Sequence, residues 1–302
     1  MRRLPALLVV ALFAVAGCGG NPLAGGADRE PDVIAIGSGN FTESQLLAEI
    51  YALALIDAGV EVEDPQAIGS REAYFPALQD GSVDLIPDYT GALLTYLDEN
   101  TTAVEPDAVY AGLGRVLPPG LVLGAMSQAE NKDAVVVTRE TAERLNVRSV
   151  ADLAPHCGKL TFGGGPEFRT RPDGIPGLAR NYGCGFGEYR TLDSGGPLTV
   201  AALRGDDVQA ANLFTTDPAL PENEFVVLTD PKENFAAQNV VPVIAERKAS
   251  PQVRAVLDRI SGELSTEELL ALNSRAAADD KPALRTVAAE WLSAKGIIGE
   301  NA

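Results

Sequence analysis

Side chains that commonly carry catalytic or metal chemistry are scarce in this sequence. It holds one histidine, three cysteines and one tryptophan among 302 residues. His156 stands next to Cys157 in a segment predicted as a loop, and no HExxH, CxxC, P-loop or EF-hand pattern occurs. These shortages argue against a transition-metal site, a cofactor and a Ser-His-Asp or Cys-His enzyme. Catalysis by carboxylates alone is left open, because Asp and Glu are common along the chain.

An apolar run long enough to cross a bilayer, about 20 residues, is also missing. The run at residues 7–15 is too short, follows two arginines and precedes small residues, which predicts a secretory signal over residues 1–17. Its end, Val-Ala-Gly-Cys at 15–18, resembles the lipobox of bacterial lipoproteins. We therefore expect a lipid on Cys18 that holds the protein at the extracytoplasmic face of the cell membrane, with residues 18–31 as a flexible tether. The alternative is an ordinary signal peptide, with Cys18 incidental.

Positive charge is in short supply. The chain has 24 Lys and Arg against 42 Asp and Glu, a formal net charge of −18. Such a surface repels nucleic acid and anionic lipid, so neither is an expected partner. The electrostatic field of this negative surface favours cationic or zwitterionic solutes. A need for solubility in an exported protein explains the negative charge equally well.

Two cysteines remain after Cys18. In an exported chain, Cys157 and Cys184 predict one disulfide that closes a loop of about 28 residues. The alternative is a pair of buried thiols.

Short apolar strands alternate with helical patterns along the rest of the chain, which predicts an α/β protein with parallel-type sheets covered by helices. A capping box formed by Thr42 and Gln45 is expected to start the first helix. The alternation restarts near residue 132, which predicts two lobes. The predicted strands cover residues 33–37, 83–87, 132–138, 160–162, 208–214, 226–228 and 240–245. The predicted helices cover residues 42–58, 71–79, 92–97, 106–116, 140–145, 150–153, 175–182, 198–203, 253–260, 266–278 and 284–292.

Several segments carry a family resemblance that extends over nearly all of the chain after residue 32. They are GSGNFTESQLLAEIYALAL (37–55), GSVDLIPDYTGALL (81–94), PEFRTRPDG (166–174), LFTTD (213–217) and NVVPVI (239–244). Together they resemble the osmoprotectant-binding proteins of ABC importers, which bind glycine betaine, choline and similar quaternary amines.

The resemblance implies a two-lobed type II periplasmic-binding-protein fold with a ligand cleft between the lobes. Lobe 1 would hold residues 32–131 and 239–302, and lobe 2 residues 132–238. The chain would cross between them near residues 128–134 and 230–240. It would be a monomeric binding protein, not an enzyme, and would close on its solute and dock on the permease subunits. The rivals are the same receptor with another ligand, and an enzyme or adhesin on this fold.

The family chemistry gives the expected site. A quaternary ammonium cannot donate a hydrogen bond and is held by aromatic faces, whereas a ligand carboxylate is held by Arg, Lys or N–H donors. By resemblance, Tyr89 supplies a cage ring, Asp88 a negative charge and Arg171 a carboxylate contact, while Thr215 and Asp217 belong to a loop of lobe 2 that faces the cleft. The expected ligand-binding residues are Phe41, Thr42, Tyr74, Asp88, Tyr89, Thr90, Arg171, Phe214, Thr215 and Gln238.

Three positions depart from the family pattern. Gly39 stands where Lys is frequent, and Phe214 and Gln238 stand where Tyr is frequent. The altered cage opens room for a neutral or aromatic ligand in place of glycine betaine.

Purely structural roles compete with the binding roles at four of these residues. Phe41 could be a hydrophobic staple for the first helix, and Arg171 could pair with Asp173 or Glu167. Tyr89 would then pack a lobe interface, and Phe214 would be core.

Overall fold

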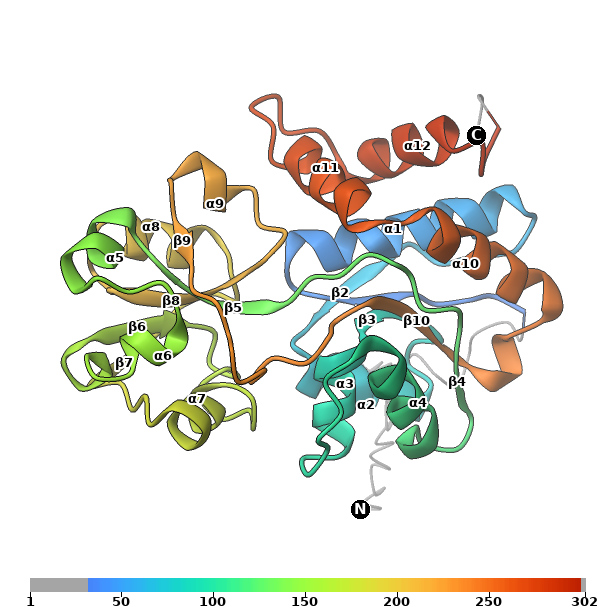
Figure 1. Cartoon of the computed structure of the whole chain (residues 1–302). Helices are drawn as coiled ribbons and strands as arrows, with labels where there is room; N and C mark the ends of the chain where they lie inside the picture. Colours follow the sequence, from blue (N-terminus) through green and yellow to red (C-terminus); the bar gives the residue numbers. More distant parts are fainter. Residues whose placement is uncertain (1–31, 300–302) are drawn as a thin grey trace, which may run out of the picture.

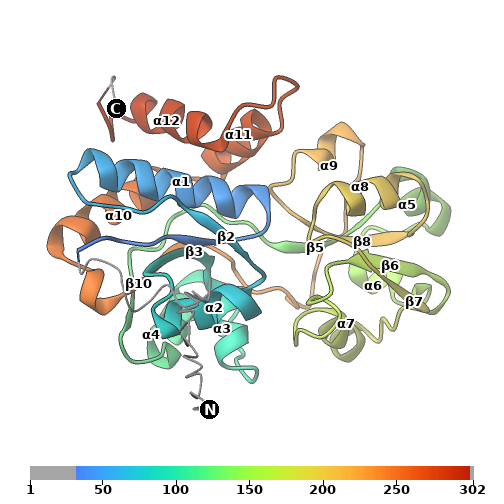
Figure 2. The same ribbon diagram turned by 180° about the vertical axis from the view of Figure 1, so that it is seen from behind.

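Two bodies joined by two chain segments make up the molecule (Figures 1 and 2). The computed structural model describes residues 32–299, so Cys18, the signal and the tether lie outside the described residues. The body that holds β1–β4, β10, α1–α4 and α10–α12 is lobe 1, and the body that holds β5–β9 and α5–α9 is lobe 2. The residue limits that the sequence predicts for the lobes stay a prediction.

Lobe 1 is built on two small sheets. Its strands are β1 (Gly37–Gly39), β2 (Gln66–Gly69), β3 (Leu85–Tyr89), β4 (Leu121–Leu123) and β10 (Val240–Ala245). Its helices are α1 (Thr42–Asp57), α2 (Arg71–Asp80), α3 (Thr90–Leu97), α4 (Pro106–Val116), η2 (Glu246–Lys248), α10 (Pro251–Glu263), α11 (Thr266–Ala276) and α12 (Leu284–Ala294). One sheet has the strand order β3-β10-β4, and β1 pairs with β2 in parallel. An isolated bridge between Ile36 and Leu85 joins the two sheets.

Lobe 2 is built on one five-stranded sheet of order β7-β6-β8-β5-β9. Its strands are β5 (Asp133–Val137), β6 (Thr161–Gly164), β7 (Glu188–Thr191), β8 (Ala210–Phe214) and β9 (Val226–Val227). Its helices are α5 (Arg139–Leu145), α6 (Val150–Leu153), η1 (Cys157–Lys159), α7 (Ile175–Tyr182), α8 (Pro197–Arg204) and α9 (Ala219–Glu222). The short elements β2, β4, β7 and α9 escaped the sequence prediction, because none has a hydrophobic period long enough to stand out.

The prediction of parallel-type sheets is wrong for the two strands that carry the chain between the lobes. β10 runs antiparallel to β3 and β4, and β5 runs antiparallel to β8 and β9. Each crossing strand arrives from the other lobe and enters its sheet at the edge where the neighbouring strand ends. It must therefore run away from that edge, opposite to its neighbour.

Both faces of each central sheet are covered by helices. In β10, Val240 and Ile244 pack into the core beside α1 and α10–α12, whereas Val241 and Val243 pack into the core beside α2–α4. β5 alternates between the two faces of lobe 2 in the same way. A strand that is covered on both faces has a continuous run of apolar residues. For this reason the sequence predicts β10 at its observed limits.

Serine side chains cap two helices in the C-terminal part, α10 and α11, whereas α1 begins without the predicted cap. The hydroxyls of Ser250 and Ser265 accept hydrogen bonds from the first turns of α10 and α11. The predicted Thr42–Gln45 capping box is wrong, because the N-cap residue of α1 is Phe41, which has no capping side chain.

Among residues 32–299, no helix combines the length and the apolar character that a membrane span requires.

The predicted disulfide is confirmed. Cys157 and Cys184 are bonded, and both are fully buried in the core between α6, α7 and β6. The bond links residues 27 apart in the sequence, and a loop of that size loses substantial entropy in the unfolded chain when it is closed.

Replacing both cysteines with alanine is expected to lower the free energy of unfolding of lobe 2 by about 3–4 kcal/mol, the loop-closure estimate for this length. Guanidinium titration of the wild type and of C157A/C184A, both non-reduced, measures the difference. A loss below about 1 kcal/mol would show that the bond adds little to stability.

Candidate functional site

The edges where β3 and β8 end face each other across the two lobes. Tyr89, the last residue of β3, pairs with Val240, the first residue of β10. Phe214, the last residue of β8, pairs with Asp133, the first residue of β5. The strand ends and the chain crossings therefore meet in one place, and an aromatic residue stands at each strand end. Ligands of open α/β proteins bind at such carboxyl edges.

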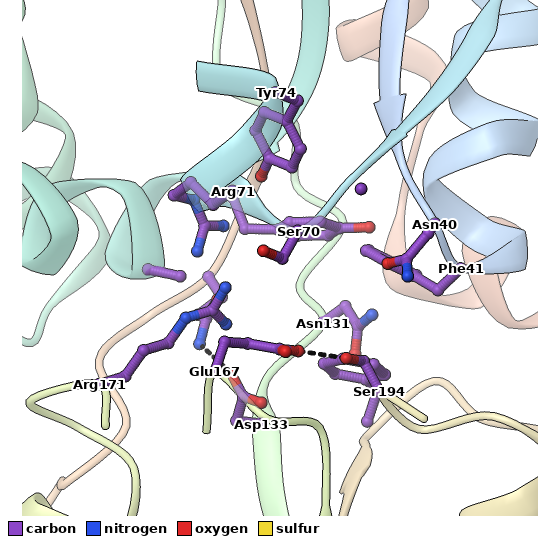
Figure 3. Close-up of a pocket in the computed structure, with 15 residues that line it drawn as sticks. Asn40, Phe41, Ser70, Arg71, Tyr74, Asn131, Asp133, Glu167, Arg171 and Ser194 are labelled. Carbon is purple, nitrogen blue, oxygen red and sulfur yellow. Dashed lines mark hydrogen bonds between the residues drawn. The ribbon is translucent and has the colours of Figure 1, made fainter. Parts of the chain in front are cut away.

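Two cavities open at this junction, on either side of Phe41 and Phe214. The arginine-side cavity contains about 480 Å³ of empty space continuous with solvent. It lies between the labelled lobe 1 residues Arg71, Tyr74 and Phe41 and the lobe 2 residues Arg171, Glu167 and Ser194 (Figure 3). Its remaining lining residues are Asn40, Gly69, Ser70, Tyr89, Ala92, Asn131, Asp133, Phe214 and Gln238.

The α11-side cavity is larger, with about 1290 Å³ of empty space open to solvent. It lies between the start of α1, α11 and the lobe 2 segments around α8 and α9. Thr42, Thr216 and Asp217 line it. Burial raises the pKa of Asp217 to about 6, with the carboxylates of Glu222 and Glu43 adding to the rise.

An aromatic cluster separates the cavities and connects the lobes. The ring of Phe41 stacks on that of Phe214 with centroids 5.3 Å apart, and it lies 6.1 Å from that of Tyr89. Two glycines leave space for these rings: a Cβ at Gly39 or at Gly195 would stand 2.7 Å from the ring of Phe41 or Phe214, respectively. Glycine at position 39, where the family frequently has lysine, therefore leaves the space that the Phe41 ring occupies.

A buried carboxylate lies behind the aromatic cluster. Glu43 is 5% exposed and accepts four hydrogen bonds from neutral donors of both lobes and one crossing segment. The donors are the Tyr89 hydroxyl at 2.6 Å, the Asn131 amide at 2.7 Å, the Thr216 hydroxyl at 2.6 Å and the Asn273 amide at 2.5 Å. Burial, with the Glu43 carboxylate second, raises the pKa of Tyr89 far above its ordinary value, so its hydroxyl remains a donor. The network fixes the orientation of the Tyr89 ring.

The structure corrects the expected role of Asp88. This carboxylate is fully buried and forms a 2.7 Å ion pair with Arg71, and it also accepts a hydrogen bond from the Tyr74 hydroxyl. Arg71 and Tyr74 line the cavity, and Asp88 lies behind them. Its charge is therefore neutralised by Arg71 instead of facing a ligand.

Arg171 lines the cavity but pairs with neither Asp173 nor Glu167. Its guanidinium forms two hydrogen bonds, of 3.0 and 3.1 Å, with the carboxylate of Glu72 at the start of α2. The pair connects the lobes. Burial opposes ionisation of Glu72, but the Arg171 guanidinium, together with hydrogen bonds from Ser70 and from the backbone of Glu72, holds its pKa at about 2.

The remaining expected residues divide into two groups. Gln238 lines the arginine-side cavity and donates from its amide to Asp133 at 3.1 Å. Thr90 and Thr215 line neither cavity: the Thr90 hydroxyl donates to the Ala237 carbonyl, and the Thr215 hydroxyl accepts from the Lys132 amide. The neighbouring Thr216 faces the α11-side cavity instead.

Several residues of the junction carry no signal that the sequence alone reveals. Glu43 in the first turn of a predicted helix resembles an ordinary surface acid, and no local pattern marks it as buried. Arg71 at the start of α2 gives no better signal. The residues missed include Glu43, Arg71, Asn131, Asp133, Glu167, Ser194, Thr216 and Asn273.

Comparisons with known proteins agree with this architecture. Residues 32–294 match the profile of the family described as "Substrate binding domain of ABC-type glycine betaine transport system". A glycine-betaine-binding protein of Pseudomonas aeruginosa is 30% identical over 273 residues, which cover 85% of this chain and 86% of that protein. A carnitine transport binding protein of Listeria monocytogenes is 25% identical over 262 residues, 84% of each chain.

A solved structure has the same fold. The ligand-free form of YehZ from Escherichia coli superposes with a TM-score of 0.61 at 25% identity, covering 87% of this chain and 99% of the other. The predicted type II periplasmic-binding-protein fold is confirmed. The family match covers nearly all of the described residues, and its members are extracytoplasmic solute-binding proteins without enzymatic activity. This chain belongs to the family of substrate-binding domains of ABC-type glycine betaine transport systems.

Proposed function

We propose that this protein is the receptor of an ABC importer and binds a quaternary-amine osmoprotectant, such as glycine betaine, choline or a related compound, between its lobes. The relatives named for glycine betaine and carnitine support this ligand class. The observation that carries the proposal is the aromatic cluster of Phe41, Tyr89 and Phe214 at the junction of the lobes.

The cluster suits a ligand that cannot donate hydrogen bonds. Trimethylammonium groups are attracted to ring faces and to nearby negative charge, and the attraction is strongest where water is excluded. Phe41 and Tyr89 come from lobe 1 and Phe214 from lobe 2, so a ligand that contacts all three favours the closed arrangement of the lobes. Phe41 and Phe214 stack directly, so the two rings must separate to admit a methylammonium group between them.

Delivery to the permease and attachment to the membrane belong to the same proposal. A receptor anchored through a lipid on Cys18 would remain near the permease, which raises its effective concentration there. We propose that it acts as a monomer, because both lobes of the cleft come from one chain.

A neutral or aromatic solute is the second candidate. Phe214 lacks a hydroxyl, and the amide of Gln238 lines the cavity where the resemblance leads us to expect another ring. Such a ligand would stack on the rings and bond to the amide without needing a cationic group.

Replacing Phe214 with leucine distinguishes a quaternary-amine ligand from a neutral or aromatic one. The change keeps an apolar side chain but removes the π face, and a desolvated cation–π contact contributes about 2 kcal/mol, so the affinity for choline or glycine betaine is expected to fall about tenfold or more. Isothermal titration calorimetry with choline, glycine betaine and carnitine measures the affinity. Phe225→Leu in lobe 2, outside both cleft cavities, is the matched control.

An affinity of F214L within twofold of the wild type would show that cation–π attraction by Phe214 does not hold the ligand. If the folded wild type released no heat with any of the three amines, the quaternary-amine class would be rejected and the receptor class would stand.

Replacing Cys18 with serine tests the anchor. The variant lacks the thiol to be acylated, so it is expected in the soluble fraction, with solute uptake impaired and ligand affinity unchanged. Cell fractionation and uptake assays measure both effects. Retention of the variant in the membrane fraction, at the wild-type level, would show that a lipid on Cys18 is not what attaches the protein.

A further inference from the structure

We propose that Glu72 sets the ligand selectivity of the arginine-side cavity by holding Arg171, so that the cavity favours cationic quaternary amines without a carboxylate, such as choline, over zwitterions such as glycine betaine. This inference rests on the proposed function and narrows it to one class of quaternary amine. Glu72 acts through Arg171 and is a positioning residue.

The guanidinium that would receive a ligand carboxylate is already occupied. Arg171 reaches into the cavity from lobe 2, and Glu72 of lobe 1 accepts its Nε–H and one terminal N–H in a bidentate pair. A carboxylate bound in this geometry is the partner that a betaine carboxylate would have to replace. The displaced Glu72 would then be left beside the incoming negative charge.

The second cation of the cavity is no more available. Arg71 is 5% exposed, and its Nε and a terminal nitrogen both bond to Asp88, which is fully buried. Removing one partner of a buried pair leaves an uncompensated charge, so this pair is expected to persist when ligand binds. Arg71 and Arg171 are the two basic residues among the described residues that line the cavity.

Two lining carboxylates, in contrast, are hydrogen-bonded to neutral groups of the described chain. Asp133 accepts from the amides of Asn212 at 2.9 Å and Gln238 at 3.1 Å. Glu167 accepts from the hydroxyl of Ser194 (Figure 3). Each arginine is matched by its own carboxylate, so Asp133 and Glu167 give the cavity a surplus of negative charge.

A charge surplus of this sign acts oppositely on the two ends of a zwitterion. It attracts the ammonium group and repels a carboxylate. An uncharged hydroxyl, in contrast, can donate a hydrogen bond to either Asp133 or Glu167 without charge repulsion. The cavity is therefore complementary to an ammonium at the aromatic cluster and to a hydroxyl donor near Asp133 and Glu167.

The experiment compares choline with glycine betaine by calorimetry on the wild type and on Glu72→Gln. Freeing Arg171 restores a charge-assisted contact for the betaine carboxylate, so the ratio of choline affinity to betaine affinity is expected to fall about tenfold or more. The ratio cancels any effect of the variant on lobe closure, because closure acts on both ligands. Glu99→Gln, an exposed acid of lobe 1 outside the cavity, should leave the ratio unchanged.

A second variant tests the surplus charge directly. Glu167→Gln keeps an acceptor for Ser194 and removes one negative charge. It should therefore lower the affinity for choline more than the affinity for glycine betaine.

The inference is overturned if the wild type binds glycine betaine as tightly as choline or tighter, or if the ratio in E72Q stays within twofold of the wild type. Either result leaves the proposed quaternary-amine receptor intact. If neither amine binds the folded wild type, the proposed ligand class and this inference both fail.

Discussion

The carboxylate of Glu43 is the contact on which the geometry of the cleft depends. A buried charge is tolerated only when its oxygens are fully hydrogen-bonded, and Glu43 obtains its four donors from β3, from the first crossing segment, from the segment after β8 and from α11. These four places belong to different parts of the chain. Satisfying one carboxylate therefore links the two lobes in this arrangement and orients the ring of Tyr89.

The topology supplies the rest of the site. Because each crossing strand starts where a strand of its own lobe ends, Tyr89 and Phe214 are placed at the junction by the sheet pairing alone. Phe41, at the start of α1, then fills the space between them. Glycine at positions 39 and 195 is required because any side chain there would meet a ring. The aromatic cluster is thus a product of strand direction and of two missing side chains.

Local signals in the sequence predicted the elements better than the site. β10, α4, α6 and α7 lie at their predicted limits, because a continuous apolar run, helix-start prolines, a capping serine and a terminal glycine are signals within a few residues. The antiparallel direction of the crossing strands follows from the path of the chain between lobes, which no local period encodes. Likewise, Arg171 and Glu72 are 99 residues apart, and Glu43 and Asn273 are 230 apart. Partners this distant have no signature in a single sequence, so the surroundings of Asp88, Thr90 and Thr215 could not be foreseen.

A crystal structure of the protein with choline tests the proposed binding mode most directly. We predict the trimethylammonium group against the faces of Tyr89 and Phe41 or Phe214, the hydroxyl toward Asp133 or Glu167, and the Glu72–Arg171 pair still formed. Choline bound away from the aromatic cluster, or bound beside a broken Glu72–Arg171 pair, would contradict it.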